Sequence, residues 1–452
     1  MSIRLGLERV SKVLQCLGNP HLNIPVIHVA GTNGKGSVCA YQTEILRCSG
    51  YNVGRFTSPF LRHPTDSVNI NGANVDRQIY QEAHVRIHTI ARQNRIQLTA
   101  FELLTVIAFE LFARPSFQLD LAVIEVGLGG LKDSTNVCRT SNTLLSCITP
   151  ISIDHQVFLG SSIPEITAQK VGIAKPHVPI LLAQQSFPQV EQIVRTRASL
   201  ESCDLFTVRP YPIPQDSTQS LPPLPLMPVE QLPSDPHPNM AHSSKSIPNP
   251  LSPTAGFQHQ NVATAVTLTH LIRTHPHPLK LLPSLAAKVT DQAIIEGLQK
   301  THWQGRLELT RYRGAEVLLD GAHNVAAAKL LGRHILSLHR PITLVFSLSS
   351  TRDPSDMIEA LDLSGMSPPV QLIATPFSVP EDMQWVSALD PDLIAHHFRR
   401  ASPHTATIIR VAQDAAHALS LALSLATRKD ELIVVCGSLY LISDVLRIIN
   451  CK

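Results

Sequence analysis

The chain has 452 residues, of which 44% are hydrophobic and 16% are charged, and its net charge is +3. This composition allows a large core and excludes a globally disordered chain, and at about 150 residues per domain the length indicates two or three domains. The small net charge and the scattered Lys and Arg residues argue against a nucleic-acid partner.

The cysteines and the apolar runs bear on the cellular compartment. None of the eight cysteines forms a CxxC pair, which favours free thiols in a reducing compartment. The first residues lack an apolar core with a cleavage site, and no apolar run reaches the roughly 18 residues of a membrane span. We therefore expect a cytoplasmic protein without a membrane partner, and the mitochondrion stays open as an alternative.

The first predicted strand, "VIHVA" at residues 26–30, leads into the glycine-rich loop "GTNGKGSV". A helical pattern then covers residues 37–47 and ends before Gly50. A loop between a strand and a helix directs backbone N–H groups and the helix N-terminus at an anion. Lys35 adds a positive charge, and Ser37 offers an oxygen of the kind that Mg²⁺ prefers. The segment therefore indicates a phosphate site.

The glycine loop departs from the common phosphate-binding pattern G-x-x-x-x-G-K-[ST]. Its first gap is shorter, and Gly36 stands between Lys35 and Ser37. The residues alone leave three alternatives open: a degraded nucleotide site, a chance glycine cluster, or a different kind of ATP enzyme.

Two later strand-like runs of the first half lead to polar side chains. Glu125 lies in "LAVIEVG", where an unpaired carboxylate costs free energy, and His155 follows "LLSCIT" after a short polar step. A hydrogen-bonded loop histidine is the simpler explanation for His155 alone. Because ligands collect at the carboxyl ends of strands in open α/β sheets, the loop, Glu125 and His155 together favour a phosphate and metal site. Between the glycine loop and Glu125, "FELLTVIAFELF" is apolar all round, which predicts a buried helix.

Residues 208–253 break the alternation of strands and helices. They are dominated by Pro, Ser, Gln and His, which predicts a polyproline-like or disordered insertion. "PPLP" within it fits an SH3 or WW ligand, although a passive surface loop is the favoured interpretation.

Beyond residue 301, strands and helices alternate clearly. The expected strands are "AEVLLD", "ITLVFSL", "VQLIAT", "ATIIRV" and "ELIVVCG", with helices such as "DAAHALSLALSLA" and "LYLISDVLRII" between them. Such alternation predicts βαβ units and a parallel sheet. We therefore expect an α/β protein with two units, at residues 1–300 and 301–452.

The motifs, taken in order, resemble one family. "VAGTNGKGSV", "FTSP", "FELLT", "EVGLGG", "DHQ", "WQGR", "LDGAHN" and "GSLYL" are similar to the dihydrofolate synthase and folylpolyglutamate synthase family of the Mur-ligase superfamily. The resemblance implies a P-loop-type ATPase domain of the Mur-ligase central type with a mainly parallel sheet, followed by a smaller Rossmann-like C-terminal domain. It also implies that the shortened glycine loop is the normal form.

The resemblance implies an ATP-dependent ligase. ATP would phosphorylate a pterin-linked carboxylate, and the amine of L-glutamate would then displace phosphate to form an amide. The implied cofactors are ATP and two Mg²⁺ ions, with K⁺ as an open addition, and the other partners are small-molecule substrates of a monomer.

The resemblance also assigns residues. The implied catalytic residues are Lys35, Glu125, His155 and Lys170. The implied ATP contacts are Thr32, Asn33, Gly34, Lys35, Gly36, Ser37, Asn261, Arg306, Asp320 and His323, and the implied metal ligands are Ser37, Ser58, Glu125, His155 and Lys170. Lys170 would bind metal as a carbamate, and a plain surface lysine is the alternative. The implied pterin-substrate contacts are Thr99, Ala100, Phe101, Glu102, Lys132, Asp133 and Ser134.

Several positions depart from the family pattern. They are Phe60 in place of His, Leu131 in place of Arg, Phe257 in place of His, and Ser347 where Gly is common. Lys132 could supply the missing positive charge one position later. These departures concern the pterin substrate more than ATP.

Three functions remain open at this point. "GLGG", "DHQ" and "GSLYL" favour dihydrofolate synthase, which adds glutamate to dihydropteroate. Folylpolyglutamate synthase, which adds glutamate to tetrahydrofolate, more often has "GIGG", "DHT" and "GSLHL". The departures also allow a non-catalytic nucleotide-binding paralogue, for which the Pro-rich insertion would be the partner-binding arm.

Overall fold

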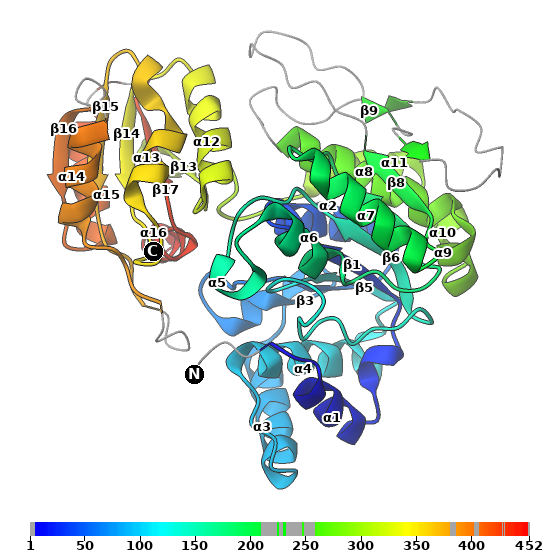
Figure 1. Ribbon diagram of the computed structural model, residues 1–452. Coiled ribbons are helices and arrows are strands. Elements are labelled where there is room, and N and C mark those ends of the chain that lie inside the picture. The colour runs from blue at the N-terminus through cyan, green and yellow to red at the C-terminus, as the bar shows by residue number, and fades with distance from the viewer. Residues whose placement is uncertain are drawn as a thin grey trace.

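The computed structural model describes residues 5–208, 224–225, 229–231, 246–247, 258–379, 386–401, 406–426, 428 and 430–450. Two α/β units lie next to each other in Figure 1, each with helices on both faces of its sheet. The expected fold class, a large mainly parallel sheet followed by a second and smaller one, is confirmed.

The first sheet has nine strands in the order β10-β8-β7-β6-β1-β5-β2-β3-β4. Six of them run parallel: β1 (Val26–Ala30), β2 (Val53–Phe56), β5 (Leu121–Glu125), β6 (Thr143–Ile148), β7 (Ile180–Leu182) and β8 (Leu205–Val208). The edge strands β3 (Val68–Ile70), β4 (Ala73–Asn74) and β10 (Val229–Gln231) are antiparallel to their neighbours. Strands β1 and β5 are parallel neighbours near the centre of the sheet. The loop after β1 and the end of β5 therefore lie side by side at the carboxyl ends of the strands.

Helices cover both faces of this sheet. They are α1 (Glu8–Cys16), α2 (Lys35–Cys48), α3 (Arg77–Gln93), α4 (Ala100–Phe112), α5 (Gln156–Leu159), α6 (Ile163–Val171), α7 (Pro188–Leu200), α8 (Gln258–Thr274), α9 (Pro276–Leu281), α10 (Leu285–Lys288) and α11 (Asp291–Lys300). Strand β1 alternates between the two faces: Ile27 and Val29 pack with α2, α8 and α11, and Val26 packs with α1, α3 and α4. Short 3₁₀ helices at Pro20–Leu22, Pro64–Ser67 and Pro115–Phe117 connect some of these elements.

The second sheet has six strands in the order β12-β13-β17-β14-β15-β16. The strands are β12 (Glu308–Tyr312), β13 (Ala315–Leu319), β14 (Ile342–Phe346), β15 (Val370–Ala374), β16 (Ala406–Val411) and β17 (Leu432–Cys436). All are parallel except β12, which forms an antiparallel hairpin with β13. Helices α12 (Val325–Ser337), α13 (Pro354–Leu361) and α14 (Pro391–Ala401) cover one face, and α15 (Ala415–Leu425) and α16 (Leu439–Asn450) cover the other. A 3₁₀ helix spans Leu363–Gly365.

The Pro-rich segment 208–253 lies mostly outside the described residues. Its described pieces are β10, which pairs with β8, and the short strands β9 (Leu224–Pro225) and β11 (Ser246–Ile247), which pair with each other. The prediction for the rest of this segment falls outside the described residues. The "PPLP" motif, at residues 222–225, is described only for its last two residues.

The described residues also bear on the cysteines and on membranes. Every described cysteine is a free thiol, and most of them are buried. No helix in the described ranges is both long enough and apolar enough to cross a membrane.

Candidate active site

The glycine loop connects β1 to α2 and is fastened to the segment after β6. The backbone N–H groups of Thr32 and Asn33 donate to the carbonyl of Pro150 at 2.9 and 3.1 Å, and the Thr32 hydroxyl donates to the Ser152 carbonyl at 3.2 Å. Gly34 stands before the first turn of α2 with φ of +85°, a conformation that favours glycine. Lys35 Nζ folds back onto the Thr32 carbonyl at 3.1 Å. These hydrogen bonds fix the loop beside the segment after β6, with Lys35 in the first turn of α2.

Two glycines of the loop make room for side chains from distant parts of the chain. A Cβ on Gly34 would overlap the Asn261 side-chain oxygen, which places the predicted ATP contact of α8 against the loop. A Cβ on Gly36 would lie 3.0 Å from Trp303 and 3.4 Å from Glu125. A side chain at Gly34 would therefore displace Asn261, and one at Gly36 would press against Trp303.

Glu125 is the centre of a cationic cluster. It ends β5 with only 4% of its surface exposed, 3.8 Å from Lys35 Nζ, and its Oε2 accepts the Ser58 backbone N–H at 3.1 Å. Burial raises the pKa of Glu125, while Lys35, the Ser58 N–H, Arg306 and Arg55 all counteract this rise. Burial outweighs these groups, so the pKa of Glu125 stays above its usual value, and a cation bound at the carboxylate would favour its charged form.

His155 and Lys170 face the same edge from the other side of the loop. Lys170 of α6 is buried and donates to the Gly31 carbonyl at 2.7 Å, so the alternative of a plain surface lysine is wrong. Burial and the charge of Lys35 lower the pKa of Lys170 to about 7, which leaves much of the amine neutral. Burial also lowers the pKa of His155, with Lys170 and Lys35 among the charges that add to this effect. The charges of these three side chains thus act on one another.

The second sheet contributes Arg306, Asp320 and His323. The Asp320 carboxylate, at the end of β13, accepts the backbone N–H groups of Leu307 and Ala322, both at 2.9 Å. His323 Nδ1 is 2.8 Å from the Gly321 carbonyl. Burial lowers the pKa of Arg306, while the charges of Asp320 and Glu125 raise it, so carboxylates from both sheets act on this guanidinium.

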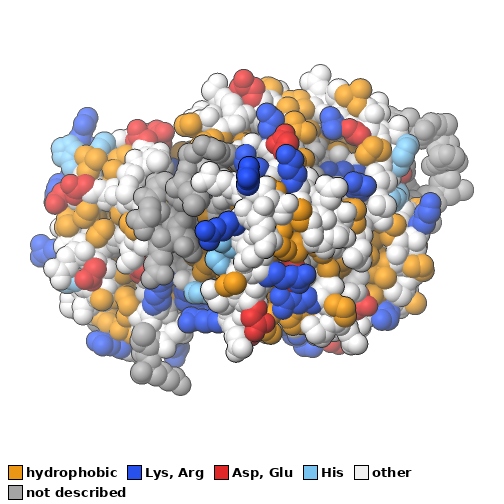
Figure 2. Space-filling model, turned by 90° about the horizontal axis from the view of Figure 1, so that it is seen from below, with side chains coloured by type: hydrophobic (Ala, Val, Ile, Leu, Met, Phe, Trp, Pro, Cys, Tyr) orange, Lys and Arg blue, Asp and Glu red, His pale blue; other side chains and the backbone are white. Residues whose placement is uncertain are grey.

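A hydrogen-bonded cluster joins the two units beside these residues. Asn324, directly before α12, donates to the side chains of Asn33 at 3.0 Å and Asp154 at 3.1 Å, and Arg352 donates to Asp154 at 2.7 Å. Sequence analysis missed Asp154, Asn324 and Arg352. The first two stand inside quoted motifs, next to His155 and His323, and that proximity was the available signal. In the view of Figure 2, basic side chains and histidines gather in the middle of the face.

The predicted pterin contacts divide into held and free side chains. Thr99 and Glu102 cap α4, and Glu102 also forms an ion pair with Arg9 at 2.7 Å. Asp133 accepts the Leu128 N–H at 2.7 Å. Phe101 packs against Gly127, and Ser134 is hydrogen-bonded to Thr105. The side chains held by internal hydrogen bonds or packing are thus Thr99, Phe101, Glu102, Asp133 and Ser134. Ala100 and Lys132 are exposed.

The departures from the family pattern fall in three environments. Phe60 packs at the edge of the core formed by α1, α3 and α4, and Leu131 is 39% exposed beside Lys132. Ser347 is buried, and its hydroxyl has no partner among the described residues. Phe257 lies outside the described residues.

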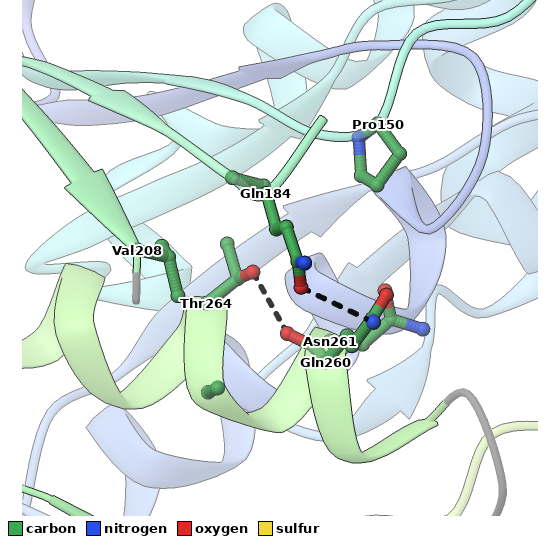
Figure 3. A pocket seen from close by; sticks show the side chains of 8 residues that line it. Pro150, Gln184, Val208, Gln260, Asn261 and Thr264 are labelled. Atoms are coloured by element: carbon green, nitrogen blue, oxygen red, sulfur yellow. Dashed lines mark hydrogen bonds between the residues drawn. The ribbon is translucent and has the colours of Figure 1, made fainter. Parts of the chain in front are cut away.

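A small pocket lies beside Asn261, between α8 and the strand ends of the first sheet (Figure 3). Gln260 Nε2 donates to Gln184 Oε1 at 3.2 Å across it, and the Thr264 hydroxyl donates to the Gln260 carbonyl at 2.8 Å. Its lining residues are Pro150, Ala183, Gln184, Val208, Gln260, Asn261, Ala263 and Thr264. The pocket is thus a mixed amide and apolar surface next to the glycine loop.

The sequence and the fold of this chain are similar to those of known proteins. Residues 305–448 match a family model described as "Dihydrofolate synthetase, C-terminal domain". Dihydrofolate synthetase of Saccharomyces cerevisiae is 32% identical over 100% of this chain and 99% of its own length. The chain belongs to the dihydrofolate synthetase and folylpolyglutamate synthase family. A probable dihydrofolate synthetase of Schizosaccharomyces pombe is 30% identical over 99% of each chain.

Solved members of the dihydrofolate synthetase and folylpolyglutamate synthase family share the fold. Folylpolyglutamate synthase of Mycobacterium tuberculosis, solved with ADP and AMPPCP, aligns with a TM-score of 0.77 at 26% identity, covering 99% of this chain and 96% of that one. The bifunctional enzyme of Yersinia pestis, solved with AMPPNP and Mn, aligns with a TM-score of 0.72 at 25% identity, covering 99% and 94%. The resemblance expected from the motifs is confirmed, and this protein is a ligase.

Proposed function

We propose that this ligase joins L-glutamate to dihydropteroate, forming dihydrofolate, ADP and phosphate. The observation that carries the proposal is the end-to-end match, at 32% and 30% identity, to two fungal proteins named as dihydrofolate synthetases. Folylpolyglutamate synthase is the alternative. The observation that supports this alternative is the similarity to the dihydrofolate synthase/folylpolyglutamate synthase of Bacillus subtilis, which is 31% identical over 80% of this chain.

The cationic cluster suits phosphoryl transfer. The acceptor carboxylate attacks the γ-phosphorus, ADP leaves, and the glutamate amine then attacks the acyl carbon and releases phosphate. Such transfer is catalysed by positioning and by neutralising charge. Lys35 and Arg306, which both act on Glu125, supply positive charge from the two units. Closure of the units around them would exclude water from the acyl phosphate.

The nucleotide would lie along the glycine loop. The N-terminus of α2 and Lys35 suit the phosphates, and Asp320 suits the ribose hydroxyls. The pocket beside Asn261 is small, and the Gln260 and Gln184 amides that line it are hydrogen-bonded to each other. The close approach of the Asn261 side chain to Gly34 of the glycine loop supports the assignment of Asn261 as an ATP contact.

The donors at the sheet edge fit a hard divalent cation. Within the described ranges, no group of three or more His, Cys, Asp or Glu side chains could hold a metal ion by itself. The available donors are the Glu125 carboxylate, the hydroxyls of Ser37 and Ser58, and His155, which suit Mg²⁺ completed by phosphate oxygens. Mg²⁺ would neutralise charge on the phosphates. Lys170 would join the donor set only as a carbamate.

We also propose a domain boundary, an oligomeric state and a cellular compartment for this protein. We place the boundary between the two units at residues 300 and 301, after α11 and before β12, with a Mur-ligase central-type unit first. The enzyme would act as a monomer in the cytoplasm, and the free thiols fit a reducing compartment. Mitochondrial location and a K⁺ requirement remain alternatives that cell fractionation and replacement of K⁺ by Na⁺ would test.

The deciding experiment compares two acceptors. Purified protein receives ATP, Mg²⁺, L-glutamate and either dihydropteroate or tetrahydrofolate, and ADP and the amide product are measured. We expect both products with dihydropteroate. ADP and amide with tetrahydrofolate alone would establish the alternative. ATP binding without turnover on either acceptor would favour a nucleotide-binding paralogue, against which the intact charge set of Lys35, Glu125 and Arg306 argues.

A further inference from the structure

Trp303 lies where the chain leaves the first unit. Helix α11 packs closely along α2, with Gly297 against Ile45, and ends at Lys300. Three residues later, the Trp303 ring reaches Gly36, in the first turn of α2. The segment 301–307 then continues to β12, the first strand of the second sheet. Trp303 is therefore the point at which this connecting segment touches the glycine loop.

Two further contacts hold the Trp303 ring. Its Cζ2 lies 3.0 Å from the place that a Cβ of residue 36 would occupy. The Arg55 guanidinium carbon, on β2, lies 4.7 Å from the ring centroid, a distance typical of cation–π contacts. Gly36 and Arg55 come from neighbouring elements beside Glu125, whose Oε2 lies 3.4 Å from the same Cβ position. The ring thus lies against the glycine loop and near the central carboxylate.

Trp303 is unlike a core tryptophan. It is only half-buried, and it belongs to none of the hydrophobic clusters formed by the described residues. Its indole N–H is buried without a partner in the described part of the chain, which costs free energy that a phenylalanine would avoid. Apolar burial alone therefore does not account for the placement of this ring.

Arg306 follows three residues after Trp303. Its Nη1 donates to the Gly305 carbonyl at 3.1 Å, and its charge acts on both Asp320 and Glu125. A Cβ on Gly321 would overlap the Arg306 guanidinium, so little free space surrounds it. Any shift of the segment at Trp303 would move Arg306 out of its place against Gly321.

We propose that Trp303 is a positioning residue of the nucleotide site. Seated on Gly36 and Arg55, it fixes segment 301–307 so that Arg306 stays against Gly321, at the start of the second unit. Gly36, the residue that separates this loop from the common phosphate-binding pattern, then leaves the room that the Trp303 ring needs at the loop. The inference rests on the proposed function only in taking the glycine loop as the ATP site.

A double-mutant cycle between Gly36 and Trp303 gives the sharpest test. Gly36→Ala in the wild-type chain should lower kcat/KM for ATP by up to about tenfold, because the ring must give way by a fraction of an ångström and a misplacement of about 1 Å can cost about a hundredfold. In a Trp303→Ala background the same change should cost less, because the close contact with the ring is gone. An equal loss in both backgrounds would show that Gly36 serves the phosphates and would overturn the proposal.

Single variants separate positioning from folding. Trp303→Ala should raise the KM for ATP and lower kcat while the KM for dihydropteroate stays unchanged, and Trp303→Phe should retain most activity because a ring still stacks on Arg55. Arg55→Gln should reproduce part of the loss, with Arg86→Gln, which removes a cation 59% exposed on α3, as the matched control. If Trp303→Ala does not fold, the cycle is run in the Trp303→Phe background. There, Gly36→Ala should cost less than in the wild type, and an undiminished cost overturns the proposal.

Fluorescence provides a readout independent of turnover. The sequence has two tryptophans, so Trp385→Phe leaves Trp303 as the only one. A non-hydrolysable ATP analogue with Mg²⁺ should change its emission with the same Kd that calorimetry measures. Calorimetric binding without any change in emission would overturn the proposal.

The outcomes also separate this inference from the proposed function. If the wild type ligates neither acceptor but Trp303→Ala weakens binding of the ATP analogue, the positioning role stands and the proposed substrate falls. If the wild type ligates dihydropteroate and Trp303→Ala matches it in every ATP parameter, the substrate stands and the positioning role falls.

Discussion

The Asp154 carboxylate accepts a hydrogen bond from the Arg352 guanidinium at 2.7 Å, and this ion pair joins the two α/β units. Asp154 lies next to His155 in the first unit, whereas Arg352 lies after β14 of the second. Burial would raise the pKa of Asp154, but the charges of His155, Arg352 and His323 outweigh burial and lower it. Asp154 is therefore a carboxylate at any pH at which the enzyme works, and its partner comes from the opposite unit.

Removing Arg352 should loosen the contact between the units. Arg352→Met leaves the Asp154 carboxylate, 4% exposed, without its cation, and breaking a buried pair costs on the order of 3 kcal/mol. This cost applies only while the two units are in contact, because water solvates the Asp154 carboxylate when they separate. The loss of Arg352 therefore favours separated units. We expect kcat/KM to fall by at least about tenfold and the radius of gyration from small-angle scattering to rise.

The matched control for Arg352 is Arg311→Met, which removes a guanidinium that is 78% exposed on β12. Arg352→Lys should restore part of the activity, since one charged donor remains. Unchanged scattering and kinetics in Arg352→Met would show that the ion pair does not hold the units together.

The pH dependence of Lys170 follows from its burial. Its pKa of about 7 in the folded chain lies well below the value of about 10.4 for an unfolded lysine. The unfolded chain therefore binds more protons between these values, so this lysine destabilises the fold below pH 7 and the penalty fades as pH rises toward about 10. We expect Lys170→Met to raise the melting temperature at pH 6 and to have a smaller effect at pH 9.

The same lowered pKa makes Lys170 a nucleophile at neutral pH. If it carries carbon dioxide as a carbamate, ¹³C-bicarbonate should give a carbamate NMR signal that grows with pH and is absent in Lys170→Met. Lys175→Met removes a neighbouring lysine and serves as the control. A bicarbonate-independent spectrum would leave Lys170 as a plain hydrogen-bond donor to Gly31.

The central part of the site could be predicted from the sequence because local signals coincide there. A buried strand, a glycine run, Lys35 and a helix are adjacent in the chain, and Glu125 is a charge at the end of an apolar run. Since parallel strands share one edge, their approach follows from topology alone. In the structure, Lys35 Nζ lies 3.8 Å from Glu125 Oε1.

Contacts between distant side chains could not be predicted in this way. Asp154 and Arg352 are 198 residues apart, and no local pattern marks Arg352 as the partner. Strand β12 was missed because it is an antiparallel edge strand with a half-exposed, polar sequence, "ELTRY". Trp303 over Gly36 depends on the packing of α11 on α2, which neither helix specifies alone.

Neutralising Glu125 should impair catalysis without unfolding the protein. Glu125→Gln keeps the shape and the Ser58 N–H contact but removes the negative charge that faces Lys35, Arg55 and Arg306. We expect kcat to fall by roughly a hundredfold and the Mg²⁺ concentration for half-maximal activity to rise. Because burial opposes the charged form, the melting temperature should stay equal or increase. Glu296→Gln, on the exposed side of α11, is the control, and an unaltered Mg²⁺ dependence would exclude Glu125 as a metal ligand.

Lys132 should contribute to binding of the pterin substrate. It is exposed beside Leu131, the position at which the motif resemblance implies arginine, and its backbone carbonyl accepts the Gly6 N–H at 3.1 Å, which fixes the segment. Lys132→Ala should raise the KM for dihydropteroate about tenfold, as expected for one lost charge-assisted contact, with the KM for ATP unchanged. Lys132→Arg should restore binding, and Lys12→Ala, an exposed lysine of α1, controls for net charge. Equal KM and kcat in Lys132→Ala and wild type would show that the enzyme binds its pterin substrate without a cation at this place, and the loss of the family's arginine would then have no compensation in Lys132.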